Sequence, residues 1–175
     1  MRWTNQRLLF CGLAASLLLG GGVYFATRRA HPMTQQADKI LIEKAARRLT
    51  LLRGGVVLKT YRVALGPQPV GHKQQEGDGR TPEGRYLVDW RNPNSKFHLS
   101  LHINYPDADD QAQAVTRGVA PGGDIMIHGL PNASVSVGAL HYLKDWTLGC
   151  IAVSNQEIEE IWHAVPDGTP VEIVP

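Results

Sequence analysis

Hydrophobic and polar residues alternate over short runs in this chain, which is typical of strands that bury one face. The runs that predict strands occupy residues 84–90, 96–105, 124–129, 150–154 and 171–174. Further upstream, two β-rich runs flank the pair Gly54–Gly55, and glycine readily adopts the positive φ of a tight turn. This pattern predicts a β-hairpin, although the alanines at 45 and 46 also allow a helix over residues 35–49.

Two segments carry the signals of helices. Residues 107–117 begin with acidic residues and are rich in alanine and glutamine. Ser154 and Glu157 form a capping-box pattern for a second helix. The apolar face of that helix consists of Ile158, Ile161, Trp162 and Val165. Since residues 67–84 are rich in glycine, proline and polar residues, we expect a surface loop there, within a mainly β domain of sandwich or barrel-like architecture with one or two short helices.

The beginning of the chain has the features of an export signal. No residue from Leu8 to Thr27 carries a charge, and as a helix this run would span about 30 Å, the thickness of a bilayer core. Arginines flank the run on both sides. We therefore expect residues 1–29 to be a signal anchor or a cleavable signal peptide, residues 30–37 a linker, and residues 38–175 the functional domain. A buried core helix is the alternative for the apolar run.

The composition narrows the choice of function. The chain has 175 residues and a formal net charge of +2, but its first thirty residues contain four arginines and no acid, so the remainder is slightly acidic. A basic patch that could neutralise many phosphates is therefore not expected, which argues against a nucleic-acid partner. The two cysteines, Cys11 and Cys150, are too few for a disulfide scaffold, so a free thiol at Cys150 in an exported domain calls for a chemical role.

His128 and Cys150 are the pair best suited to that role. A thiol is only slightly ionised at neutral pH, and a neighbouring imidazole activates it by taking its proton. Gly149 lets the backbone approach closely before the thiol, and the amide of Cys150 is a candidate donor to an oxyanion. The same residues also fit a structural interpretation, in which Cys150 is a small buried apolar residue and His128 a hydrogen-bonded core histidine.

Longer motifs surround this pair. The chain carries, in order, a hairpin-like run at 47–66, Thr-Pro-Glu-Gly-Arg-Tyr at 81–86, His-Gly at 128–129, Asn-Ala-Ser-Val-Ser-Val-Gly at 132–138 and Thr-Leu-Gly-Cys-Ile at 147–151, with Asn155 close behind. In this order and spacing, the motifs resemble those of the L,D-transpeptidase catalytic domain family, also called the YkuD-type domain. The resemblance covers about residues 38–175.

The resemblance implies a mainly β fold, a thiol enzyme that acts on peptidoglycan stem peptides, and no metal or organic cofactor. Cys150 would be the nucleophile and His128 the general base, with Gly149 beside the thiol and a backbone carbonyl near Gly129 orienting the imidazole. The candidate substrate-binding residues are Gly129, Thr147, Trp146 and Arg80, the last as a partner for a stem-peptide carboxylate. The implied location is the cell envelope, on the periplasmic side of the cytoplasmic membrane, with the protein anchored or secreted.

Departures from the family pattern, among them a longer spacing of 22 residues between His128 and Cys150, leave the donor and acceptor specificity open. Leu148 stands where many members have His or Arg, and Ala152 stands where many have Arg. The runs at 145–153 and 122–129 resemble a subgroup that includes enzymes that hydrolyse peptidoglycan bonds or release attached envelope proteins. A hydrolase that releases groups or envelope proteins attached to stem peptides is therefore the alternative to a transpeptidase. A non-catalytic peptidoglycan-binding module is a lower alternative.

A zinc peptidase is a third possibility. His98 and His102 share one face of a predicted strand, and His128 or His141 would have to complete the ligand set. No glutamate base stands beside such a pair, so the sequence does not predict a metal site.

Overall fold

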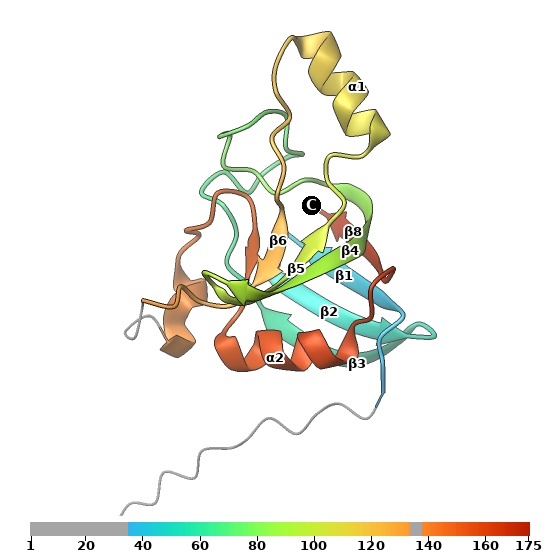
Figure 1. Cartoon of the computed structure of the whole chain (residues 1–175), viewed down its shortest axis with the longest axis vertical. Helices are drawn as coiled ribbons and strands as arrows, with labels where there is room; N and C mark the ends of the chain where they lie inside the picture. The colour runs from blue at the N-terminus through green and yellow to red at the C-terminus, as the bar shows by residue number, and fades with distance from the viewer. Residues whose placement is uncertain (1–34, 134–137) are drawn as a thin grey trace, which may run out of the picture.

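The computed structural model describes residues 35–133 and 138–175, in which a mixed β-sheet forms the framework (Figure 1). The strands of this part are β1 (Lys39–Glu43), β2 (Arg48–Arg53), β3 (Val56–Arg62), β4 (Gly84–Ser95), β5 (His98–Ile103), β6 (Met126–His128), β7 (Ile151–Ala152) and β8 (Pro170–Val174). Its helices are α1 (Ala108–Arg117), the 3-10 helix η1 (Gly138–Leu143) and α2 (Asn155–Ala164). The expectation of a mainly β fold with short helices is confirmed.

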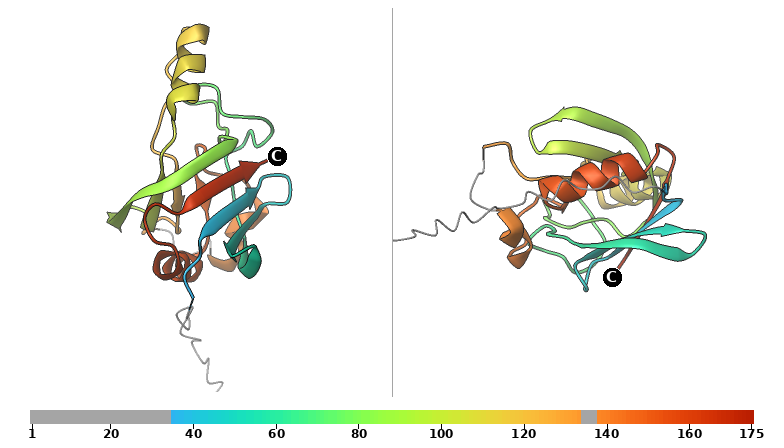
Figure 2. Two further views of the ribbon diagram at one scale, coloured as in Figure 1. Left: turned by 90° about the vertical axis from the view of Figure 1, so that its right-hand side faces the viewer. Right: turned by 90° about the horizontal axis from the view of Figure 1, so that it is seen from below.

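The described strands form one sheet in the order β3-β2-β1-β8-β4-β5-β6-β7. Neighbours are antiparallel except for the parallel pairs β1–β8 and β6–β7. The long strand β4 pairs with β8 near its start and with β5 along the rest, so it connects the two halves of the sheet (Figure 2). An antiparallel bridge between Ala64 and Ala152 then links the segment after β3 to β7. The architecture is therefore one curved sheet closed like a barrel, rather than a sandwich of two separate sheets.

The domain begins with a pair of strands, and the alternative helix over residues 35–49 is wrong. Ile40 and Ile42 in β1, and Leu49 and Leu51 in β2, are fully buried at alternate positions. Alternate residues of a strand project from one face, whereas a helix would turn them to different sides. Burial of this face outweighs the helix propensity of the alanines in the connecting turn.

Most other predicted elements agree with the structure. The Gly54–Gly55 turn joins β2 to β3 with positive φ at both residues, and capping boxes begin both α-helices. β4 is longer than the predicted strand at 84–90 and continues to Ser95. The loop at 67–84 contains buried residues as well as exposed ones, so it does not lie wholly on the surface.

The two α-helices lie at opposite ends of the molecule (Figures 1 and 2). Ile158 and Ile161 of α2 are fully buried in the hydrophobic core, as the predicted apolar face requires. α1 projects beyond the sheet, begins at the N-cap Asp107 and ends at Gly118 in the left-handed conformation.

The described residues contain no helix that is long and apolar enough to cross a bilayer. The predicted signal anchor or signal peptide at residues 1–29 lies outside them, as does most of the linker at 30–37. These boundaries stay predictions.

A buried lysine ties the 67–84 loop to the sheet. Lys44 directly follows β1 and is only 1% exposed. Its ammonium group donates hydrogen bonds to the carbonyl oxygens of Gly71 at 2.6 Å and Thr81 at 2.9 Å, and to the Glu83 carboxylate at 2.8 Å. Burial lowers the pKa of Lys44, and the Glu83 carboxylate opposes that shift. Three acceptors thus replace the water that this ammonium group loses on folding.

We predict that Lys44→Met lowers the free energy of unfolding by about 3 kcal/mol, because Glu83 and two carbonyl oxygens lose their donor. Urea unfolding of the full-length protein, followed by circular dichroism, measures this change. Lys39→Met is the matched control, since Lys39 pairs with Glu172 at the surface and its loss should cost less than about 1 kcal/mol. Equal losses in the two variants would contradict the anchoring role of Lys44.

Candidate active site

A cavity of about 650 Å³ opens beside the end of β6, and three parts of the chain line it. Residues between 90 and 100 contribute from the β4–β5 hairpin, Met126 contributes from β6, and residues 146–150 contribute from the turn before β7, except for Gly149. The cavity brings together four of the predicted site residues: His128, Trp146, Thr147 and Cys150.

Strand pairing places Cys150 beside β6. β6 and β7 are parallel, with Ile127 opposite Ile151. Cys150 directly precedes β7, so its position lies opposite Met126, and Met126 and His128 project from the same face of β6. The Met126 amide donates a hydrogen bond to Cys150 Sγ at 3.4 Å, in agreement with this placement.

The imidazole of His128 is held in one orientation. Its Nδ1 lies 2.7 Å from the carbonyl oxygen of Gly129, so Nδ1–H donates and the neutral ring keeps a lone pair on Nε2. The rings of Phe97 and Trp146 pack against it, with centroids 4.5 and 5.8 Å away. Burial lowers the pKa of His128 and outweighs the opposite effect of the Gly129 carbonyl. At neutral pH this ring is therefore a neutral base.

The thiol of Cys150 is also neutral at rest. It donates to the carbonyl oxygen of Asp124 at 3.5 Å and accepts from the Met126 amide. Burial raises the pKa of the Cys150 thiol, and the negative charge of Asp124 acts in the same direction. The Met126 amide and the Lys73 ammonium group oppose this shift without cancelling it. A reaction of this thiol at neutral pH therefore needs a base.

A tight turn presents the thiol to the cavity. Thr147 Oγ1 donates to the carbonyl oxygen of Cys150 at 2.8 Å and accepts from the Gly149 amide at 3.2 Å, which closes the turn through a side chain. Gly149 has a φ of +126°, and a Cβ there would lie 2.5 Å from the carbonyl oxygen of Arg80. The amide of Cys150 itself donates to no other residue in the described part of the chain. It is therefore the donor that this turn leaves for a ligand.

Close backbone packing supports the turn from beneath. A Cβ at Gly66 would lie 2.1 Å from the carbonyl oxygen of Gly79 and 3.1 Å from the Gly149 nitrogen. The Thr147 amide donates to the Leu65 carbonyl oxygen at 3.0 Å. Close backbone contacts therefore help to set the position of the turn, together with the Thr147 side chain that closes it.

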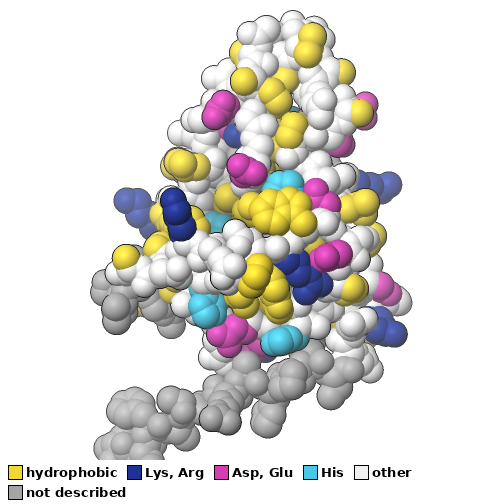
Figure 3. Space-filling model, viewed as in Figure 1, with side chains coloured by type: hydrophobic (Ala, Val, Ile, Leu, Met, Phe, Trp, Pro, Cys, Tyr) yellow, Lys and Arg dark blue, Asp and Glu magenta, His cyan; other side chains and the backbone are white. Residues whose placement is uncertain are grey.

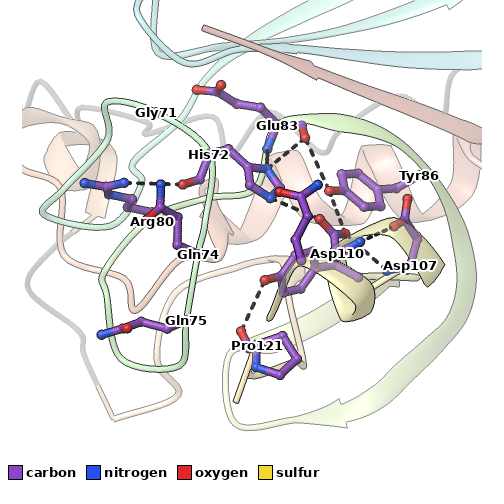
Figure 4. A network of polar contacts seen from close by, with 12 residues as sticks. Gly71, His72, Gln74, Gln75, Arg80, Glu83, Tyr86, Asp107, Asp110 and Pro121 are labelled. Atoms are coloured by element: carbon purple, nitrogen blue, oxygen red, sulfur yellow. Dashed lines mark hydrogen bonds and ion pairs between the residues drawn. The ribbon is translucent and has the colours of Figure 1, made fainter. Parts of the chain in front are cut away.

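The structure places Arg80 outside the cavity. Its guanidinium donates to the carbonyl oxygen of His72 at 3.5 Å, within the 67–84 loop (Figure 4). The His72 ring in turn contacts Asp110 of α1, with Nε2 3.0 Å from a carboxylate oxygen. Arg80 thus lies against the thiol turn through its backbone carbonyl, and its side chain does not line the cavity, so its role in substrate binding stays a prediction. Gly129 likewise acts through its carbonyl oxygen.

The other described histidines do not gather around a common point. His98 Nε2 lies 2.7 Å from a carboxylate oxygen of Glu159, and His102 Nδ1 lies 2.5 Å from Asp89. His141 is buried, and neither ring nitrogen has a partner among the described residues. Within residues 35–133 and 138–175, no cluster of three or more His, Cys, Asp or Glu could hold a metal, so the zinc-peptidase arrangement is not formed there.

Much of the cavity wall is not evident from the sequence. Trp90, Asn92 and Asn94 line the cavity from alternate positions of β4, and Phe97 packs on His128. The strand predicted from the sequence ends at residue 90, and the polar run that follows contains Pro93, so the sequence gives no strand signal that could have found the two asparagines. Phe97 carries no such signal, because its contact with His128 arises only when the hairpin folds over β6.

Comparisons with known proteins give a consistent result. A family model described as "YkuD: L,D-transpeptidase catalytic domain" matches residues 37–173. The Escherichia coli K12 protein named "Putative L,D-transpeptidase YafK" is 33% identical over 112 residues, which are 62% of this chain and 37% of that protein. This chain therefore spans well under half the length of that relative.

Solved structures with a similar fold come from several bacteria. The helical cell shape determining protein Pgp2 from Campylobacter jejuni has a TM-score of 0.60 and 23% identity, covering 80% of this chain and 48% of that chain. An L,D-transpeptidase from Xylanimonas cellulosilytica has a TM-score of 0.51 and 19% identity, covering 82% of this chain and 63% of that chain. At these identities the likeness concerns the fold.

We predict that alkylation of Cys150 by iodoacetamide has its pH midpoint above that of the same residue in the urea-unfolded chain, because the folded pKa is raised. Peptide mass spectrometry after timed alkylation from pH 6 to 10 separates Cys150 from Cys11. Asp124→Asn should lower the midpoint, since it removes a nearby negative charge, whereas Asp167→Asn serves as a distant control. A folded midpoint below that of the unfolded chain would indicate a preformed thiolate and contradict the neutral resting state of Cys150.

Proposed function

Because the chain belongs to the L,D-transpeptidase catalytic domain family, we propose that it is a thiol-dependent enzyme that acts on peptidoglycan stem peptides in the cell envelope. The observation that carries the proposal is the single cavity shared by Cys150 and His128, in which Gly129 orients the imidazole and leaves Nε2 available. In this proposal, residues 1–29 direct the chain to the membrane, and the domain works on the periplasmic side, anchored or secreted.

The first half-reaction forms a thioester. His128 Nε2 takes the thiol proton as Cys150 Sγ attacks the carbonyl carbon of the third residue of a tetrapeptide stem. The bond between this L-centre and the following D-residue then breaks, and its nitrogen leaves with the proton held by His128. The tripeptide acyl group stays on Cys150, and the terminal amino acid is released.

The thiol turn favours this step, whereas burial of the two side chains opposes the proton transfer that begins it. Negative charge develops on the attacked carbonyl oxygen, and we assign its stabilisation to the Cys150 amide, which donates to no other described residue. Burial raises the pKa of Cys150 and lowers that of His128, so both partners start neutral. Burial therefore disfavours a resting thiolate–imidazolium pair, so the proton moves as Sγ attacks, when a donor to the oxyanion offsets part of the cost.

The second half-reaction determines the outcome. An amine that attacks the thioester gives cross-linking or exchange, and the protein is then a transpeptidase. Water gives hydrolysis, which is the second candidate because the turn at 147–151 contains no charged side chain to hold an acceptor and exposes Leu148 to solvent. Either outcome remodels the cell wall, which agrees with the role in cell shape that the name of Pgp2 states for that protein.

We predict that Cys150→Ala lowers product formation by at least about 1,000-fold, because the acyl-enzyme cannot form. The full-length protein is incubated with tetrapeptide muropeptides, with and without a free D-amino acid, and products are identified by mass spectrometry. Cys11→Ala is the matched control and should keep the wild-type rate. Exchange or dimer products that depend on Cys150 would establish transpeptidation, and hydrolysis alone would establish the second candidate.

A third result would contradict both enzymatic proposals. If neither wild type nor Cys150→Ala gives a product, while both bind isolated sacculi equally, the protein is a non-catalytic peptidoglycan-binding module. Equal product formation by the two proteins would instead exclude Cys150 as the nucleophile.

We also predict that kcat/KM falls at acid pH with a midpoint below about 6.5, the ordinary pKa of histidine. Protonation removes the base, and since burial lowers the pKa of His128, the active neutral ring persists to lower pH. His128→Gln should lower the rate about 100- to 10,000-fold. His98→Gln, which changes a histidine outside the cavity, should leave the acid midpoint unchanged. A wild-type midpoint above 6.5 would show that another group controls the rate.

A further inference from the structure

Trp90 combines exposure with a fixed orientation. Its residue surface is 41% exposed, yet the indole stacks on the ring of His102, with centroids 4.9 Å apart and 18° between the planes. Figure 3 shows hydrophobic side chains that lie against histidine and carboxylate side chains in the middle of one face and are open to solvent. The stack holds one side of the indole and leaves the remainder for a ligand.

A β-bulge and a carboxylate hold this stack in place. Val88 pairs with Ile103 and Trp90 pairs with His102, so Asp89 is the extra residue of β4. The Asp89 carboxylate lies 2.5 Å from His102 Nδ1 and orients the imidazole against the indole. The proposed reaction uses none of these side chains, so their arrangement calls for a separate explanation.

Trp90 lies in the same row of the sheet as the nucleophile. Trp90 pairs with His102, His102 pairs with Met126, and Met126 lies opposite Cys150. Adjacent strands are about 4.8 Å apart, so three spacings separate Trp90 from Cys150 by about 14 Å. Both residues line the same cavity. A ligand bound at Cys150 therefore reaches Trp90 only if it is extended.

Polar side chains continue the wall beyond the indole. Asn92 and Asn94 follow Trp90 at alternate positions of β4 and line the same cavity, and Lys96 adds a positive charge. An asparagine amide has two donors and a carbonyl acceptor, and in Asn92 the carbonyl already accepts from the Asn94 backbone amide at 2.9 Å, which leaves its NH2 group to donate. A flat aromatic surface beside neutral amides suits a pyranose ring, which has an apolar C–H face and a rim of hydroxyl or acetamido groups.

We propose that Trp90, Asn92 and Asn94 form a subsite for the N-acetylated sugar that carries the stem peptide. This inference rests on the proposed function, which places the third stem residue at Cys150. Three extended residues reach about 10 Å, and the lactyl ether between stem and sugar adds a few ångströms more. The sugar of a bound stem therefore lies at the Trp90 end of the row, where its C–H face packs on the indole and its polar groups pair with the amides.

The test compares two substrates that differ only in the sugar. The full-length protein is assayed with a disaccharide tetrapeptide and with the same tetrapeptide after removal of both sugars. We expect the wild-type kcat/KM to be about 10-fold higher for the disaccharide form, and Trp90→Ala to reduce this ratio to about one. Trp90→Phe keeps a smaller aromatic surface and should give an intermediate ratio, while Trp162→Phe, on α2 outside the cavity, should keep the wild-type ratio.

Two results would overturn the sugar subsite. A wild-type ratio close to one would show that the sugar is not recognised. If Trp90→Ala slows both substrates equally, so that their ratio is unchanged, the indole contacts the peptide or only supports the wall.

A binding measurement separates this inference from the proposed reaction. Cys150→Ala is titrated with glycan chains whose stem peptides have been removed by an amidase, and tryptophan indole N–H signals are followed by NMR. We expect saturable shifts, and an affinity about 10-fold weaker when Trp90→Ala is added. If this binding holds but no substrate is turned over, the sugar subsite stands and the proposed reaction fails. If the glycan does not bind, or binds equally without Trp90, the subsite is refuted whatever the reaction.

Discussion

The close approach of three backbone segments beneath the thiol is the constraint on which the site depends. Residues 65–66, 79–80 and 147–150 pack so tightly that a methyl group at Gly66 or Gly149 would overlap a carbonyl oxygen. Backbone hydrogen bonds from Thr147 to Leu65, and between Ala64 and Ala152, join the same segments. The closure of the sheet and the position of Cys150 therefore depend on the same contacts, because those that join the ends of the sheet also hold the turn.

The backbone fixes the positions in the site, and the surroundings of Cys150 and His128 determine their protonation states. Burial favours the neutral form of both the thiol and the imidazole, since it raises the pKa of Cys150 and lowers that of His128. The Gly129 carbonyl selects the tautomer in which Nε2 can accept a proton. Lys44 shows the contrasting solution, in which a charge is kept in the interior by three acceptors. The interior thus keeps a charged group at Lys44, where it joins a loop to the sheet, and keeps Cys150 and His128, the proposed reacting pair, neutral.

Sequence patterns correctly predicted the elements whose formation depends on residues close together in the chain. The alternation at 96–105, the Gly54–Gly55 turn and the capping box at Ser154 all correspond to observed elements. The Thr-Leu-Gly-Cys motif and His128 indicated two residues that the fold does bring into one cavity. Each of these features depends on residues close in sequence or on a motif of the family.

Features that depend on register or on long-range packing could not be predicted in this way. Arg80 stands beside a family motif, yet the loop turns its guanidinium toward His72 and away from the cavity. Likewise, the bulge at Asp89 sets the row that contains Trp90, and a bulge follows from pairing with another strand rather than from the residue itself. The helix alternative at 35–49 failed for a related reason, since the buried face of β1 and β2 exists only within the completed sheet.

The backbone packing beneath the thiol turn has a consequence for how such a protein can change during evolution. Side chains of the β4–β5 hairpin form much of the cavity wall, but they take no part in the hydrogen bonds that hold the thiol turn. Apart from Phe97, which packs on His128, residues of this wall can therefore be replaced while the thiol turn stays in place. The fold thus leaves much of the cavity wall open to divergence and to redesign.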